Sequence, residues 1–175
     1  MIIKNYKEGI LNFFIENPTR RVRFREIERE LQIPLPSVIR YIRELNAEGY
    51  ARKEEIGKVI FYSADRSSQR FIIKKRSHNL EHLYGSGLIE YLREEFSNPL
   101  IVLFGSYFKG EDTEKSDIDI FIQGKEDKKI ELKKYENALG RKIQLFFGKI
   151  SGNSNKELAN SIINGTVLNG YLEVF

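Results

Sequence analysis

A Gly-Ser pair and an Asp-x-Asp pair, each joined to a short apolar segment, constrain the fold of this chain more than any other feature. Residues 100–104 form a continuous apolar run, which predicts a buried strand ending at Gly105-Ser106. Ten residues separate Ser106 from Asp117, and Asp117 and Asp119 stand at the start of a second predicted strand, residues 118–122. Buried strands need covering helices, so we expect an α+β unit here, with a mixed sheet and flanking helices.

The residue types at these positions indicate a ligand that carries phosphate. Gly105 allows the backbone to approach a phosphate, and Ser106 can bind the anion together with backbone N–H groups where a helix begins. Asp117 and Asp119 point to the same side of a strand because side chains alternate. Two such carboxylates are costly unless a cation lies between them, and magnesium bridging nucleotide phosphates is the usual solution. The alternative is a surface loop followed by an edge strand with its Asp residues in solvent.

These residues resemble the nucleotidyltransferase superfamily of DNA polymerase beta, in particular its minimal nucleotidyltransferases. The resemblance covers roughly residues 88–175 and rests on Gly105-Ser106, Gly110 and the spacing to Ser116-Asp117 and Asp119. It implies that Gly105 and Ser106 hold a triphosphate, and that Asp117 and Asp119 are catalytic and bind two magnesium ions. It also implies transfer of a nucleoside monophosphate, AMP in the first instance, from a nucleoside triphosphate to a hydroxyl. Lys109, Arg141 and Lys142 are candidates for neutralising phosphate charge.

One position departs from the family pattern. The family has a third acidic residue on the next strand, and here the predicted strand at residues 142–147 carries Gln144 in its place. An amide can form hydrogen bonds, but it cannot act as a base at neutral pH. Glu131 and Glu136, in a helix predicted over residues 130–138, are possible substitutes. Three functions stay open: an active transferase, a nucleotide-sensing regulator of weak or no activity, and an antitoxin-like protein bound to a helical protein partner.

The first third of the chain predicts a separate helical unit with a hairpin. Apolar residues recur at helical spacing over residues 6–16, 24–32 and about 36–48, and residues 50–55 and 59–63 read as two strands joined by a tight turn. Three helices followed by a β-hairpin is the order of a winged helix-turn-helix. The stretch 32–53 resembles the winged helix of bacterial and archaeal transcription regulators, which supports the fold more strongly than the ligand.

Charge is distributed unevenly between the two parts of the chain. Residues 1–76 hold 17 Lys and Arg against 10 Asp and Glu, a net +7, whereas residues 77–175 hold 12 against 15, a net −3. A basic unit of this kind predicts binding to duplex DNA, with a protein-interaction or dimerisation scaffold as the alternative. The predicted DNA contacts are side chains outside the apolar face of the third helix or on the hairpin: Ser37, Arg40, Tyr41, Arg43, Arg52, Lys53 and Lys58.

These observations predict a winged-helix domain at residues 1–66, a connecting helix at 67–87 and a nucleotidyltransferase-like domain at 88–175. The last of these closes with a helix expected over residues 156–168, and its charged loop at 111–115 is expected to be solvated. His78 and His82 stand one helical turn apart, but no third metal ligand is evident. Apolar runs fall far short of the roughly 20 residues that a membrane span requires. With no cysteine and no signal-peptide pattern, we expect a cytoplasmic protein, with homodimerisation left open.

Overall fold

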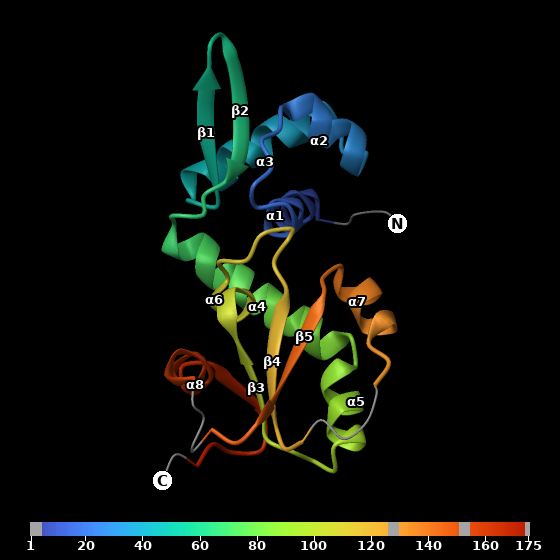
Figure 1. Ribbon diagram of the computed structural model, residues 1–175. Coiled ribbons are helices and arrows are strands. Elements are labelled where there is room, and N and C mark those ends of the chain that lie inside the picture. The colour runs from blue at the N-terminus through green and yellow to red at the C-terminus, as the bar shows by residue number, and fades with distance from the viewer. Residues whose placement is uncertain (1–4, 126–129, 151–154, 174–175) are drawn as a thin grey trace. The chain divides into compact units, whose positions relative to one another are not determined.

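The structure is a computed structural model that describes residues 5–125, 130–150 and 155–173. Contacts between residues divide the chain into two compact units, Met1–Lys75 and Arg76–Phe175. Helix α4 (Gln69–Gly85) contains the boundary and therefore contributes to both units (Figure 1). Of the helices in these described ranges, none combines the length and the apolar character that crossing a bilayer would take.

The N-terminal unit consists of three helices and a hairpin, as the sequence predicts (Figure 1). Its helices and strands run as follows: α1 (Tyr6–Glu16), α2 (Phe24–Leu31), α3 (Leu35–Ala47), β1 (Ala51–Ile56) and β2 (Val59–Ala64). The two strands pair antiparallel over their whole length, and Val22 adds an isolated antiparallel bridge to Tyr62. The hairpin is thereby attached to the segment that precedes α2.

One hydrophobic core holds the N-terminal unit together. Phe14, Ile27 and Ile42, from the three helices, are fully buried, and Tyr62 of β2 joins them. Lys75 is 1% exposed and donates a 2.7 Å hydrogen bond from Nζ to the carbonyl oxygen of Ile15. Carbonyl groups in the last turn of a helix have no partner within the helix, so this lysine satisfies one of those in α1.

The C-terminal unit is a four-stranded mixed sheet with helices on both faces, as expected from the sequence. The strands lie in the order β5-β4-β3-β6; β4 and β5 are parallel, and β3 is antiparallel to both of its neighbours. In chain order the elements after α4 are α5 (Leu88–Glu95), β3 (Ile101–Phe104), α6 (Gly105–Lys109), β4 (Ile118–Gln123), α7 (Lys133–Leu139), β5 (Ile143–Gly148), α8 (Lys156–Ile163) and β6 (Thr166–Asn169).

Side-chain alternation divides this sheet between two cores. Ile101 and Leu103 of β3 pack in a cluster with α5 and α7, whereas Val102 and Phe104 pack in a second cluster with Ile162 of α8. Figure 1 shows these helices on the two sides of the sheet. Because Asp119 and Phe121 stand two residues apart on β4, the Asp119 side chain lies on the α8 face.

The helix predicted over residues 156–168 is wrong in its second half. Helix α8 ends at Ile163, and Thr166–Asn169 forms the edge strand β6, which pairs with β3. Between α8 and β6, the backbone at Gly165 lies very close to β3, because an added Cβ there would be 2.5 Å from the Leu103 carbonyl oxygen. Only glycine leaves room for the chain to turn there. The helix predicted over residues 130–138 also begins later, at Lys133.

Candidate active site

The pairing of β3 with β4 brings the Gly-Ser turn and the Asp-x-Asp segment together. The two strands are antiparallel, and Phe104, the last residue of β3, stands opposite Asp119 near the start of β4. Helix α6 starts at the next residue, Gly105, and Asp117 directly precedes β4. Residues that are more than ten positions apart in the sequence therefore meet at one end of the sheet.

Gly105 is required at this turn for two independent reasons. Its φ angle is +77°, a left-handed conformation that residues with a side chain rarely adopt. A Cβ at this position would also overlap with Oδ2 of Asp119 and lie 3.2 Å from its Cγ. The backbone thus enters α6 directly against the Asp119 carboxylate.

The two aspartates differ in their exposure. Asp117 is exposed, whereas Asp119 is half-buried. Burial, and secondarily the negative charge of Asp117, raise the pKa of Asp119 above its usual value. A bound cation would favour the charged carboxylate and so act against both effects.

This pair of carboxylates fits a magnesium ion that arrives with a nucleotide. Magnesium is commonly held by one or two carboxylates together with substrate phosphates and water. Within the described parts of the chain, no cluster of three or more His, Cys, Asp or Glu side chains could hold a metal by itself. The rings of His78 and His82 lie 5.8 Å apart on α4, and they are part of no such cluster.

The neighbouring strand places an amide beside this pair of aspartates. In the parallel register of β4 and β5, Asp119 is the partner of Gln144, and Ile118 is the partner of Ile143. Partners in register point to the same face of a sheet, and the side chain of Gln144 is exposed. The position next to Asp119 on β5 therefore carries a group that cannot accept a proton at neutral pH.

An open pocket of about 420 Å³ lies against Asp117. Besides Asp117, its walls include Lys115, Lys133, Arg141 and Lys142, so cations outnumber carboxylates. Glu136 of α7 also lines it. Arg141 and Lys142 are among the cations that the sequence predicts for phosphate, whereas Lys115 and Lys133 are not, because their place here depends on how α7 and the loop before β4 fold.

Glu136 shares that pocket with Asp117 but is held by its own partners. Its carboxylate accepts hydrogen bonds from Ile143 N–H (3.3 Å) and from Lys142 Nζ (3.3 Å). Burial alone would raise the pKa of Glu136, but these two donors outweigh it, and the net pKa is lowered. Glu131, the other candidate base, accepts from the backbone N–H of Lys133 at the start of α7 and does not line this pocket.

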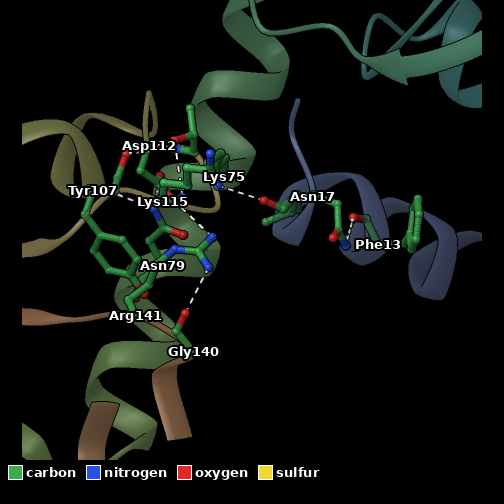
Figure 2. A network of polar contacts seen from close by, with 12 residues as sticks. Phe13, Asn17, Lys75, Asn79, Tyr107, Asp112, Lys115, Gly140 and Arg141 are labelled. Carbon is green, nitrogen blue, oxygen red and sulfur yellow. Dashed lines mark hydrogen bonds and ion pairs between the residues drawn. The ribbon is translucent and has the colours of Figure 1, made fainter. Parts of the chain in front are cut away.

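A buried polar network supports α6 and the loop before β4 (Figure 2). Asn79 of α4 donates 2.8 Å hydrogen bonds to the Tyr107 carbonyl and to Oδ1 of Asp112. Oδ2 of Asp112 lies 3.8 Å from Nη2 of Arg141. Asp112 is 1% exposed, so the prediction of a solvated loop at 111–115 is wrong at this residue, whereas Glu111 and Lys115 are exposed. The network joins α4, α6 and the segment before β5. It therefore connects the helix that begins at the Gly105 turn with the segment that carries Arg141.

The remaining predicted phosphate ligands lie on α6. Ser106 is half-buried in the first turn of this five-residue helix, and its carbonyl accepts from Glu111 N–H at 3.0 Å. Lys109 is exposed at the other end of the helix.

The predicted DNA contacts all lie in the N-terminal unit. Ser37, Arg40, Tyr41 and Arg43 are on α3, Arg52 and Lys53 are on β1, and Lys58 is in the hairpin turn. Arg40 donates to Glu44 at 2.9 Å, and Arg52 forms an ion pair with Glu54. Tyr41 packs partly against the core, so only part of its ring is accessible. The other basic side chains of this set are exposed.

Comparison with protein families identifies the segment that contains the aspartates. The family model described as "Nucleotidyltransferase domain" matches residues 86–161. The match covers less than half of the chain. The matched segment contains Gly105, Ser106, Asp117, Asp119 and Gln144, and the N-terminal unit lies outside it. Comparison with curated proteins gave no match.

Proposed function

We propose that this chain transfers a nucleoside monophosphate, AMP in the first instance, from a nucleoside triphosphate to a hydroxyl acceptor. The observation that carries the proposal is the close approach of the Gly105 turn to Asp119 within a nucleotidyltransferase domain. A phosphate-binding turn and a carboxylate pair are the two parts that nucleotidyl transfer requires, and here they share one end of the sheet.

Each group has a distinct task in the proposed reaction. Ser106 and the backbone N–H groups of its turn bind the triphosphate, and Lys109 adds positive charge. Asp117 and Asp119 would hold two magnesium ions when the nucleoside triphosphate is bound. Bound magnesium would neutralise the charge of the triphosphate and of the departing pyrophosphate. The hydroxyl oxygen of the acceptor attacks the α-phosphorus and its proton passes to water, while the bond from the α-phosphorus to the oxygen that bridges to the β-phosphate breaks and pyrophosphate leaves.

Transfer of labelled nucleotide tests this proposal directly. The full chain is incubated with α-labelled ATP and magnesium, alone and with cell extract, and label on an acceptor is the expected result. Replacing both Asp117 and Asp119 with Asn should abolish the label, and it should also abolish the rise in melting temperature that ATP with magnesium gives over ATP with a chelator. Glu157→Gln, at an exposed carboxylate on α8, is the matched control. Label transfer that survives the double replacement would remove the reaction from these residues.

A regulatory function is the second candidate, and Gln144 favours it. General-base assistance is typically worth about a hundred- to ten-thousand-fold in rate, and the partner of Asp119 on β5 cannot provide it. In this second proposal the domain senses a nucleotide or acts as an antitoxin-like partner of a helical protein. Gln144→Asp should then raise transfer from a low level while ATP binding stays the same. Vigorous wild-type transfer that Gln144→Asp does not change would contradict it and assign the base to another group, with Glu136→Gln as the next variant.

For the N-terminal unit we propose a winged helix that binds duplex DNA. Its net charge of +7 over residues 1–76, from 17 Lys and Arg against 10 Asp and Glu, supports this proposal. Binding by the full chain should weaken steeply with salt. Replacing Arg40 and Arg43 with Ala should remove most of the affinity, whereas Arg29→Ala with Lys74→Ala, an equal change in charge outside α3 and the hairpin, should have a small effect. Absence of salt-sensitive binding to any duplex pool would favour the protein-interaction alternative, which light scattering can examine as homodimer formation.

A further inference from the structure

A second pocket, in the N-terminal unit, has a lining rich in arginine. Its volume is about 310 Å³, and Thr19, Arg21, Arg52, Ser63 and Arg66 contribute polar groups to its walls. All of these residues precede α4, so the pocket is formed without any residue of the nucleotidyltransferase domain. Among the residues that the structure describes, none with an acidic side chain lines it.

The pocket lies on the face of the hairpin that points away from the core of the unit. Residues opposite one another in an antiparallel pair share a face, and here Ala51 is opposite Ala64, and Lys53 is opposite Tyr62. Ala51, Ala64 and Tyr62 belong to the hydrophobic core. Arg52 and its partner Ser63 therefore occupy the other face.

Two of the arginines are held in place by a single carboxylate. Glu54, next to the pocket on β1, forms an ion pair with Arg21 at 2.8 Å and another with Arg52. The side chain of Glu54 is only 20% exposed, and Ser63, 4% exposed, lies 3.4 Å from Nε of Arg52. Three guanidinium groups thus line the pocket beside this carboxylate, and no change of physiological pH removes their charge.

We propose that this pocket binds a phosphate group. The planar guanidinium group presents paired N–H donors that match phosphate oxygens, and the hydroxyl groups of Thr19 and Ser63 also line the pocket. The volume stands at the lower end of the range for small-ligand sites, roughly 300–1,000 Å³, and is enough for a phosphate and part of the molecule that bears it.

The phosphate has two possible sources with the same chemistry. It belongs either to the backbone of a duplex bound by this unit or to a free phosphate ester that acts as an effector. The site is independent of the proposed transfer reaction, because it uses none of the groups around Asp117 and Asp119.

Site-resolved titration of the full-length chain tests the proposal. Inorganic phosphate is added to ¹⁵N-labelled protein at constant ionic strength with EDTA present, and amide shifts are followed. Saturable shifts are expected at Thr19, Ser63 and Arg66. Arg66→Ala should weaken the binding at least tenfold and Arg66→Lys less, while Arg29→Ala, at an exposed arginine on α2 outside the pocket, should leave it unchanged. Arg66 is exposed, so its variants should retain the wild-type melting temperature.

Glu54→Gln gives a variant with the opposite expectation. Removing the competing carboxylate should tighten phosphate binding several-fold, provided that the hairpin amide shifts show an intact strand pair. The proposal is overturned if no saturable shift occurs at these amides, or if Arg66→Ala binds phosphate as well as the wild type does.

Duplex DNA then distinguishes the two sources. A backbone phosphate predicts that Arg66→Ala lowers DNA affinity, reduces the salt slope by about one, and makes inorganic phosphate a competitor of DNA. A free effector predicts unchanged DNA affinity for Arg66→Ala and tighter binding of a phosphate ester such as ADP than of inorganic phosphate at the same amides. Either result supports a phosphate site in this pocket.

Discussion

Replacing Gly105 with Ala would test the geometry on which the candidate active site depends. The left-handed backbone at this residue, φ +77°, costs a residue with a side chain about 1–2 kcal/mol. The added methyl group would also overlap with Oδ2 of Asp119, so that side chain must move. Turning it away from a favoured rotamer costs about 0.5–1.5 kcal/mol. We therefore expect Gly105→Ala to destabilise the C-terminal unit by about 2–3 kcal/mol.

A matched glycine and a second substitution separate the two contributions. Gly140 also has a positive φ, +63°, but a Cβ there would meet no atom within 4 Å, so Gly140→Ala should show the backbone cost alone. In an Asp119→Ala background the conflict at Gly105 should disappear, because the added Cβ would be 3.4 Å from the Cβ of residue 119, an ordinary contact. Residues in contact show such non-additive effects in a double-mutant cycle.

Scanning calorimetry of the full chain gives the required free energies, because it can resolve the transitions of two units. A steric conflict between residue 105 and Asp119 is contradicted if Gly105→Ala costs no more than Gly140→Ala, or if its cost is the same without the Asp119 carboxylate. ATP with magnesium should stabilise Gly105→Ala less than it stabilises Gly140→Ala, since only the first change displaces a proposed ligand.

Two further substitutions follow from the same part of the structure. The pKa of Asp119 is higher in the folded than in the unfolded chain, chiefly because of burial, so its charge lowers stability as pH rises from the unfolded to the folded pKa. Asp119→Asn should accordingly melt higher than wild type at neutral pH without ligand, with the difference fading at about pH 3; an equal difference at both pH values would contradict this. Asn79→Ala removes the donor to Asp112 and to the Tyr107 carbonyl and should cost about 2–3 kcal/mol in urea unfolding. The exposed Asn137→Ala should change stability by less than about 0.5 kcal/mol, and similar costs for the two variants would show that the buried network is unimportant.

The sequence predicts those parts of the fold that depend on neighbouring residues. The continuous apolar runs of β3 and β4 identify both strands. The Gly-Ser and Asp-x-Asp pairs are recognisable because they interrupt or follow these apolar runs. Strand β6 is different. Its four residues follow α8 and can continue a helical pattern, and they become a strand because they pair with β3, more than sixty residues earlier in the chain.

The sequence does not predict which polar groups are buried, because this too depends on residues far apart in the chain. Asp112 lies in a run of charged residues, which normally indicates solvent. It is buried because Asn79, 33 residues away along the chain, donates to it from α4. Arg52 is predicted as a DNA contact from its charge alone, whereas in the structure it forms an ion pair with Glu54, two residues along the same strand.

The position of Gln144 bears on how an enzyme and a sensor with this fold would differ. Phosphoryl transfer depends mainly on positioning and on electrostatic stabilisation, and the Gly105 turn and the two aspartates are retained. Loss of a general base removes roughly two to four orders of magnitude in rate, out of an enhancement that for enzymes is typically at least about a million-fold. A domain with Gln144 beside Asp119 would thus bind nucleotide in the geometry of an enzyme while reacting slowly. Nucleotide binding alone cannot separate the two functions, because both predict it; only the rate gained by restoring a carboxylate at residue 144 can.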